Sequence, residues 1–200
     1  MIESALIQSG ITSIAGVDEA GRGACAGPLV VAAVILRDPH SQSLNEVRDS
    51  KILAPKKREK LFDIIIEEAI AYSIVSIEAE EIDRIGLHIS NLEGMRRAVA
   101  QLGVEPSYVL TDGYVIDGIS APHLAVWKGD QVAISISAAS ILAKVTRDRV
   151  MRELDLRYPG YGFAGHKGYV TKVHQEAIEK FGVLPIHRRS YANIAPLINR

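Results

Sequence analysis

The sequence predicts an α/β fold in which a sheet core is followed by a helical C-terminal portion. Three observations support this: two apolar, strand-like runs near the N-terminus, short strands among helical patterns in the middle, and mostly helical patterns from Ser135 onward. A length of 200 residues suits one core of good size and is hardly enough for two independent domains. We therefore expect one domain over residues 1–200, with its helical C-terminal region over about 145–200.

The first two apolar runs flank a glycine-rich turn between Ile11 and Leu36. The second run, from Pro28, is continuous and rich in β-branched residues, which is typical of a strand covered on both faces. A helix is expected to start at Pro55, because proline suits a first helical turn and apolar residues then recur at helical spacing. The next expected elements are a strand over 72–77 and helices over 80–85 and about 90–102.

The second half of the chain contains two short expected strands, over 107–111 and 124–127. A long helix over 135–158 follows, and Pro159 with its neighbouring glycine ends it. After a glycine-rich loop, the last amphipathic helix is expected over 169–181.

Composition excludes several classes of protein. Hydrophobic residues make up 48% and charged residues 24% of the chain, which excludes intrinsic disorder. The longest apolar run is too short to cross a bilayer, the N-terminus does not resemble a signal peptide, and the single Cys25 has no partner for a disulfide within the chain. We expect a cytoplasmic protein without membrane segments, and a monomer as the simplest state.

The net charge of −1 hides an uneven distribution. Residues 1–143 contain 12 Lys and Arg against 19 Asp and Glu, whereas residues 144–200 contain 11 against 5. A basic C-terminal quarter beside an acidic remainder indicates a polyanionic partner and a separate cluster of carboxylates. Ordinary scatter of surface charge is the alternative interpretation.

Acidic residues occur at three expected strand ends or beside glycines: Asp18 with Glu19, then Asp112, then Asp130. An aspartate beside a glycine is usually a turn residue, but the first pair interrupts an apolar strand. Neighbouring strand residues point to opposite faces, so Asp18 and Glu19 can share a site only if the strand ends or bulges there. Four carboxylates in one pocket would need cations, and oxygen ligands suit Mg²⁺ or Mn²⁺. Two such ions about 3.5–4 Å apart are typical of phosphodiester hydrolysis.

The glycine-rich segment Gly21-Arg22-Gly23 matches neither a P-loop nor a dinucleotide-binding motif. Its glycines would let the backbone approach a ligand closely, and Arg22 could meet a phosphate. A tight turn with an exposed arginine is the alternative.

Six motifs, in this order, closely resemble bacterial ribonuclease HII: GVDEAGRGACAGPLVVAAV, RDSKILAPKKREKL, TDGY, KGD, SAASILAKVTRD and HKGYVTKVH. The resemblance extends from about Ile14 to Tyr191. It implies an RNase H-like fold, with a mixed five-stranded sheet flanked by helices and a helical C-terminal region. The implied activity is cleavage of RNA in RNA–DNA hybrids and nicking on the 5′ side of single ribonucleotides in duplex DNA. The products would carry 3′-hydroxyl and 5′-phosphate ends, in ribonucleotide and RNA-primer removal.

The resemblance also assigns residues. Its four metal-binding acids, which are also the catalytic residues, match Asp18, Glu19, Asp112 and Asp130. Asp148 is a rival for the fourth, but it lies in an expected helix beside two arginines, where a surface ion pair is the simpler interpretation.

Substrate contacts are implied in the same way. The segment Gly21, Arg22 and Gly23 would contact the 2′-hydroxyl and adjoining phosphates, and Tyr169 would stack on the deoxyribose that follows the ribonucleotide. Packing on the core is the alternative for this tyrosine. Phosphate contacts are expected from the basic residues Lys51, Lys144, Arg147, Lys167 and Lys172, although each could be an ordinary surface charge.

Other residues are expected to be structural. Cys25 and Trp127 are predicted in the core, and the six histidines have no metal-ligand spacing, so zinc is not expected. His166 could lie near the nucleic acid or pack internally.

Three competing interpretations remain. Ribonuclease HIII shares the fold and acids but has an additional N-terminal domain, for which the residues before Ile14 leave no room. A catalytically inactive hybrid-binding module would have lost an acid. A nucleotide-binding regulatory domain would need the missing P-loop lysine.

Overall fold

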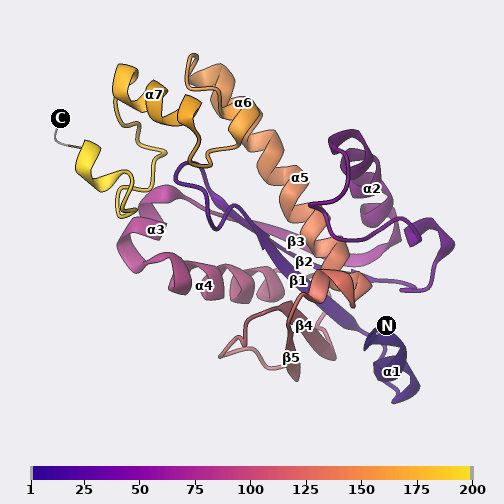
Figure 1. The fold of residues 1–200 in the computed structure, drawn as a ribbon. Coiled ribbons are helices and arrows are strands. Elements are labelled where there is room, and N and C mark those ends of the chain that lie inside the picture. The colour runs from indigo at the N-terminus through magenta and orange to yellow at the C-terminus, as the bar shows by residue number, and fades with distance from the viewer. Residues whose placement is uncertain (1, 199–200) are drawn as a thin grey trace.

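The computed structural model describes residues 2–198 and contains one mixed five-stranded sheet with the strand order β3-β2-β1-β4-β5 (Figure 1). β1 pairs antiparallel with β2 and parallel with β4, β2 pairs antiparallel with β3, and β4 pairs parallel with β5. The strands are β1 (Ile14–Ala20), β2 (Leu29–Leu36), β3 (Ala69–Ile77), β4 (Tyr108–Asp112) and β5 (His123–Val126). The predicted α/β class with a mixed five-stranded sheet is therefore confirmed.

Helices cover both faces of this sheet (Figure 1). The long helix α5 packs on β1 and β2 with α2 beside it, and α4 covers the opposite face together with α3. The α-helices are α1 (Ile2–Gln8), α2 (Pro55–Glu68), α3 (Ala79–Ile85), α4 (Leu87–Ala100), α5 (Ile134–Arg157), α6 (Phe163–His166) and α7 (Lys172–Phe181). Single 3-10 turns are η1 (Gln42–Leu44), η2 (Gly129–Gln131) and η3 (Ala195–Leu197).

Strand β2, between β1 and β3, has all eight residues buried, as its continuous apolar run predicts. Val30 and Val34 face the core under α5 and α2, whereas Val31 and Ile35 face the core under α4. Beside it, α5 begins directly against the backbone of β1: a Cβ on Gly16 would lie 2.1 Å from the carbonyl carbon of Ser135. This close approach fixes the start of α5 against β1, the strand that carries Asp18 and Glu19.

The C-terminal region forms a small third core around Cys25, Met151, Phe163 and Ile178. The burial of Cys25 agrees with the prediction. The segment 24–28 joins this core to the sheet, because the Cys25 amide donates to the carbonyl of Gly168 (2.9 Å) and the Cys25 carbonyl accepts from the Arg188 amide (2.8 Å). The residues that follow the glycine-rich segment are therefore held by the last 40 or so residues of the chain.

The last amphipathic helix begins later than predicted. α7 starts at Lys172 and not at Tyr169, because the Thr171 hydroxyl caps the helix by accepting from the His174 amide at 3.2 Å. Tyr169 therefore lies in a loop. No helix within residues 2–198 is long and apolar enough to cross a membrane.

Candidate active site

The acidic residues meet where β4 ends beside β1. Pairing between these parallel strands stops at Val17 and Thr111, whereas β1 continues along β2 as far as Ala20. Asp112 is the last residue of β4, so it lies next to the part of β1 that carries Asp18 and Glu19. β1 does not bulge at the acidic pair, because its register with β2 is regular there, and it ends one residue later, at Ala20. The site opens because the neighbouring strand ends.

Asp18 and Glu19 point to opposite faces of the sheet, since the register of β1 with β2 is regular. Asp18 alternates in phase with Ala20 and lies on the α5 face, and Glu19 alternates in phase with Val17 and lies on the α4 face. The Asp18 carboxylate also accepts from the Glu19 amide at 2.7 Å. A ligand beside the last residues of β1 can reach both carboxylates, because β4 does not pair with this part of β1.

Asp112 and Asp130 are connected by the turn that follows β5. The Gly129 amide donates to Oδ1 of Asp112 at 2.8 Å, which places the next residue, Asp130, beside the end of β4. Asp130 is buried with 4% exposure, and its Oδ2 lies 3.6 Å from Nζ of Lys51. A cavity of about 560 Å³ is lined by Glu19, Asp112 and Asp130.

Burial and the charges of neighbouring carboxylates raise the pKa of three of the acids. The pKa of Asp18 is raised well above its usual value by burial and then by the charges of Glu19 and Asp112. Burial, followed by the charge of Asp112, raises the pKa of Glu19 to about 7. The pKa of Asp130 is raised by burial and by the nearby Asp49. Such a cluster favours protons or cations in its vicinity.

The chemistry of this donor set fits a hard divalent cation. Oε2 of Glu19 and Oδ2 of Asp130 are buried, and neither has a hydrogen-bond partner within residues 2–198. No three His, Cys, Asp or Glu side chains of that range converge closely enough to hold an ion by themselves. Asp112 nevertheless acts electrostatically on each of the other three acids. Buried carboxylate oxygens without a hydrogen-bond partner are acceptors of the kind that an oxygen-coordinated ion uses.

The Arg147 side chain packs directly against the glycine-rich segment at Gly21. Gly21 has φ of +90°, and a Cβ there would lie 1.8 Å from Nε of Arg147. The arginine is fully buried and donates to the carbonyls of Pro28 (2.9 Å) and Ala26 (3.1 Å), and burial lowers its pKa to about 10. The expectation that Arg147 contacts phosphate disagrees with this burial. Its Nε and Nη2 donate to the protein's own backbone, and Nη1 is buried without a hydrogen-bond partner within residues 2–198.

Tyr169 lies beside the glycine-rich segment on the surface. Its side chain is 41% exposed, and its ring edge lies 3.7 Å from the position of a Cβ on Gly23. A second cavity, of about 380 Å³, is lined by Glu19, Gly21, Lys144 and Tyr169. Glu19 therefore joins the two cavities, and the residues predicted to bind metal and substrate lie along one surface.

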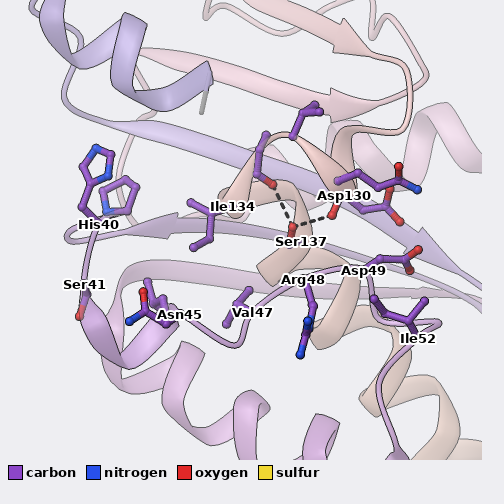
Figure 2. A pocket seen from close by; sticks show the side chains of 15 residues that line it. His40, Ser41, Asn45, Val47, Arg48, Asp49, Ile52, Asp130, Ile134 and Ser137 are labelled. Carbon is purple, nitrogen blue, oxygen red and sulfur yellow. Dashed lines mark hydrogen bonds between the residues drawn. The ribbon is translucent and has the colours of Figure 1, made fainter.

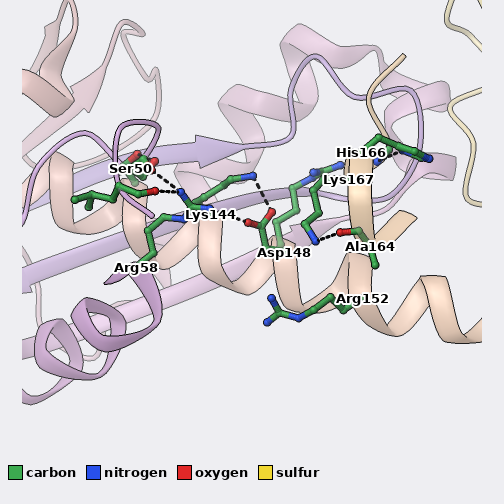
Figure 3. A network of polar contacts seen from close by, with 12 residues as sticks. Ser50, Arg58, Lys144, Asp148, Arg152, Ala164, His166 and Lys167 are labelled. Carbon is green, nitrogen blue, oxygen red and sulfur yellow. Dashed lines mark hydrogen bonds and ion pairs between the residues drawn. The ribbon is translucent and has the colours of Figure 1, made fainter. Parts of the chain in front are cut away.

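The remaining basic residues differ in whether their charged groups bind other parts of the protein. Figure 3 shows Lys144 and Lys167 with their partners. Nζ of Lys144 donates to Asp148 at 2.7 Å, and the other carboxylate oxygen lies 3.4 Å from the Arg58 guanidinium. Asp148 is thus a buried counter-ion, and the predicted surface pair with its neighbouring arginines is wrong. Nζ of Lys167 donates to the Ala164 carbonyl at 2.6 Å. Lys51 and Lys172 are the most exposed of the predicted basic residues, with 75% and 89% of their side chains exposed. Lys51 lies beside Asp130, whereas Lys172 pairs with Glu176 on α7.

Comparisons with known proteins agree on one family. The family model described as ribonuclease HII matches residues 15–194. The chain belongs to the ribonuclease HII family. A curated ribonuclease HII from Rhodococcus erythropolis is 55% identical over 193 residues, which cover 96% of this chain and 85% of that protein. The enzyme is accordingly a ribonuclease H-type endonuclease that acts on the RNA strand of RNA–DNA hybrids.

Solved structures agree with the fold. Ribonuclease H2 from Pyrococcus horikoshii superposes with a TM-score of 0.81 and 30% identity, over 94% of this chain and 98% of that one. Bst-RNase HIII in complex with Mn²⁺ has a TM-score of 0.70 at 21% identity, over 98% of this chain and 72% of that one, and shows the fold alone.

Two residues that support the glycine-rich segment were not predicted from the sequence. Arg188 is fully buried and donates to the carbonyls of Gly27 and Arg22. The Tyr191 hydroxyl donates to the same Arg22 carbonyl at 2.9 Å. Nothing in the sequence distinguishes Arg188 from the exposed Arg189, so part of the basic C-terminal charge is structural.

Three histidines, His166, His174 and His187, contact one another in series, and the middle one contacts the Tyr169 carbonyl. The His174 ring stacks on His166 with centroids 4.3 Å apart, and its Nε2 lies 3.1 Å from Nε2 of His187. Nδ1 of His174 lies 3.0 Å from the Tyr169 carbonyl, and Nδ1 of His187 accepts from the Leu184 amide. This chain of contacts is satisfied when both rings are neutral, with His187 donating to His174 and His174 donating to Tyr169. Burial lowers the pKa of His187 to about 4.

A further cavity, of about 480 Å³, opens between the loop around Arg48 and the start of α5 (Figure 2). It shares Asp49 and Asp130 with the acidic cavity, so the loop that carries Lys51 borders both. Trp127, expected in the core, is instead 82% exposed.

Proposed function

We propose that the enzyme cleaves RNA–DNA hybrids, and nicks 5′ to single ribonucleotides in duplex DNA, by divalent-metal catalysis at Asp18, Glu19, Asp112 and Asp130. The observation that carries the proposal is the clustering of the acids at the end of β4. There the pKa values of Asp18, Glu19 and Asp130 are raised, and buried oxygens of Glu19 and Asp130 have no hydrogen-bond partner within residues 2–198. Membership of the ribonuclease HII family supports the reaction class.

The four carboxylates would hold Mg²⁺ or Mn²⁺. When bound, such ions supply an activated water and stabilise the leaving 3′-oxygen, so the products carry 3′-hydroxyl and 5′-phosphate ends. Lys51 beside Asp130 adds positive charge at the edge of the cluster. The similar fold of Bst-RNase HIII, a protein solved in complex with Mn²⁺, is consistent with this proposal.

The surface beside the acids suits a ribonucleotide junction. The segment Gly21, Arg22 and Gly23 offers backbone groups to a 2′-hydroxyl, and Tyr169 offers a half-exposed ring to the next deoxyribose. The buried Arg188 donates to the Arg22 carbonyl, and the buried Arg147 packs against Gly21, which positions this segment. Phosphate contacts are proposed for the lysines Lys51, Lys144 and Lys167.

The test is a labelled DNA duplex with one internal ribonucleotide, incubated with Mg²⁺, Mn²⁺ or EDTA. The proposal predicts a metal-dependent nick on the 5′ side of the ribonucleotide, leaving a 3′-hydroxyl. Cleavage in EDTA would remove the metal from the proposal. If the enzyme cuts an RNA–DNA hybrid but leaves the single-ribonucleotide duplex uncut, the proposed junction specificity is wrong.

A further inference from the structure

Trp127 is the only tryptophan in the chain and one of its most exposed apolar side chains, at 82%. It lies directly after β5 and lines the same cavity as Glu19, Asp112 and Asp130. Full burial of a large apolar side chain stabilises a protein by about 1.5–3 kcal/mol, and Trp127 forgoes most of this. A large aromatic group exposed beside a catalytic cluster is an unusual use of surface.

The local backbone holds Trp127 outward. Lys128 has φ of +53°, a left-handed conformation that side chains other than those of glycine and asparagine rarely adopt. The next residue, Gly129, is fixed from two sides. Its amide donates to Asp112, and a Cβ on it would lie 2.4 Å from Cδ1 of Ile136. The turn is thus anchored at Gly129, and Trp127 precedes the anchor on the solvent side.

Trp127 and Tyr169 line two different cavities beside the acids. The cavity lined by Trp127 and the cavity lined by Tyr169 have Glu19 and Lys51 in common and otherwise differ in their lining. A nucleic-acid strand whose phosphate lies at the carboxylates can therefore contact Tyr169 on one side and Trp127 on the other. Tyrosine and tryptophan faces pack well on nucleotide rings and sugars.

We propose that Trp127 packs against the deoxyribose of the nucleotides on the 5′ side of the scissile phosphate. This inference rests on the proposed function, which places Tyr169 on the deoxyribose 3′ to the ribonucleotide. The strand must then continue past the acids toward Trp127 with its 5′ portion. Lys128, exposed and next in the chain, is available to a phosphate of the same segment.

The single tryptophan gives a direct test by acrylamide quenching of its emission. The protein is kept in EDTA, so that metal-dependent cleavage does not intervene, and saturation is established by the fluorescence anisotropy of a dye on the duplex. A duplex with one ribonucleotide and a full upstream strand should protect Trp127, lowering the quenching constant about threefold or more. Shortening the labelled strand to leave no nucleotide upstream should restore quenching, although the duplex stays bound through its downstream part.

Variants separate this role from others. Tyr169→Ala should still show protection of Trp127, because the two aromatic residues contact different sides of the cleavage point. Trp127→Ala should raise KM about tenfold and leave kcat within about twofold, and Trp127→Phe should restore most of the affinity. Leu156→Ala, which truncates a side chain that is 84% exposed on α5, is the matched control and should change neither constant.

Saturated binding without protection, or protection that persists after the upstream nucleotides are removed, would overturn the inference. An unchanged KM in Trp127→Ala would do the same. Failure of the proposed function has a different result: the wild-type enzyme would not nick the ribonucleotide duplex in Mg²⁺ or Mn²⁺, whatever Trp127 contacts.

Discussion

Replacing Glu19 by glutamine should stabilise the metal-free enzyme while abolishing its activity. The pKa of Glu19 is raised in the folded protein from its usual value of 4.5 to about 7. A carboxyl group with a raised folded pKa favours the folded state at low pH and opposes it as pH rises from 4.5 through 7. Because one pKa unit corresponds to about 1.4 kcal/mol, the ionised Glu19 costs about 3 kcal/mol at pH 8.

Thermal unfolding in EDTA at pH 5 and pH 8 measures this cost. For a chain of 200 residues, about 3 kcal/mol corresponds to a Tm difference of roughly 6–12 °C. Glu19→Gln should approach that gain at pH 8 and show little gain at pH 5, where the wild-type carboxyl is already protonated. Added Mn²⁺ should stabilise the wild-type protein more than the variant, because the ion compensates the same charge.

The matched control is Glu153→Gln, an exposed glutamate on α5, which should leave Tm within about 1–2 °C at both pH values. A gain for Glu19→Gln that is equal at pH 5 and pH 8 would show that packing and not charge is responsible. No gain at pH 8 would refute the electrostatic description of the site.

Three further predictions concern the surroundings of the site. Arg147→Lys should lower the free energy of unfolding in urea by about 2–4 kcal/mol, because it leaves the carbonyls of Ala26 and Pro28 without their donors, and an unchanged midpoint would contradict this. Because the folded pKa of His187 lies near 4, below the usual 6.5, stability from this group is present above pH 6.5 and falls by up to about 3 kcal/mol toward pH 4; His187→Gln should flatten that part of a urea-unfolding pH profile. Tyr169→Ala should reduce the preference for ribonucleotide junctions in cleavage assays with little change in Tm, whereas a large loss of Tm would favour the core role.

The local sequence pattern predicts where the strands of the sheet lie, but not how far neighbouring strands pair with one another. The continuous β-branched run gave β2 correctly, because burial on both faces leaves no alternation in the sequence. It could not predict that β4 ends two residues short of the end of β1, because pairing length depends on partners elsewhere in the chain. That difference in length is what opens the site at Asp18 and Glu19.

Two of the incorrect residue predictions, at Arg147 and Trp127, have physical reasons that lie outside the local sequence. The motif resemblance predicts Arg147 at a phosphate, with an ordinary surface charge as the alternative, and the sequence predicts Trp127 in the core. In the structure Arg147 is fully buried and Trp127 is 82% exposed. Arg147 is buried because Gly21 leaves room for its guanidinium beside two backbone carbonyls. Trp127 is exposed because the left-handed turn at Lys128 directs it outward. Long-range contacts and single backbone conformations determined these positions, and neither is visible in local composition.

Direct counting of bound Mn²⁺ tests the central claim, that the carboxylates at the end of β4 and β1 hold the catalytic metal. Electron paramagnetic resonance of free Mn²⁺ in a titration with substrate-free protein gives the number of sites and their affinity. Asp112→Asn should weaken Mn²⁺ binding at least about tenfold, whereas Asp117→Asn, which removes a nearby exposed carboxylate, should bind as the wild type does. Equal binding by the wild type and Asp112→Asn would contradict the account, because the metal would then lie elsewhere.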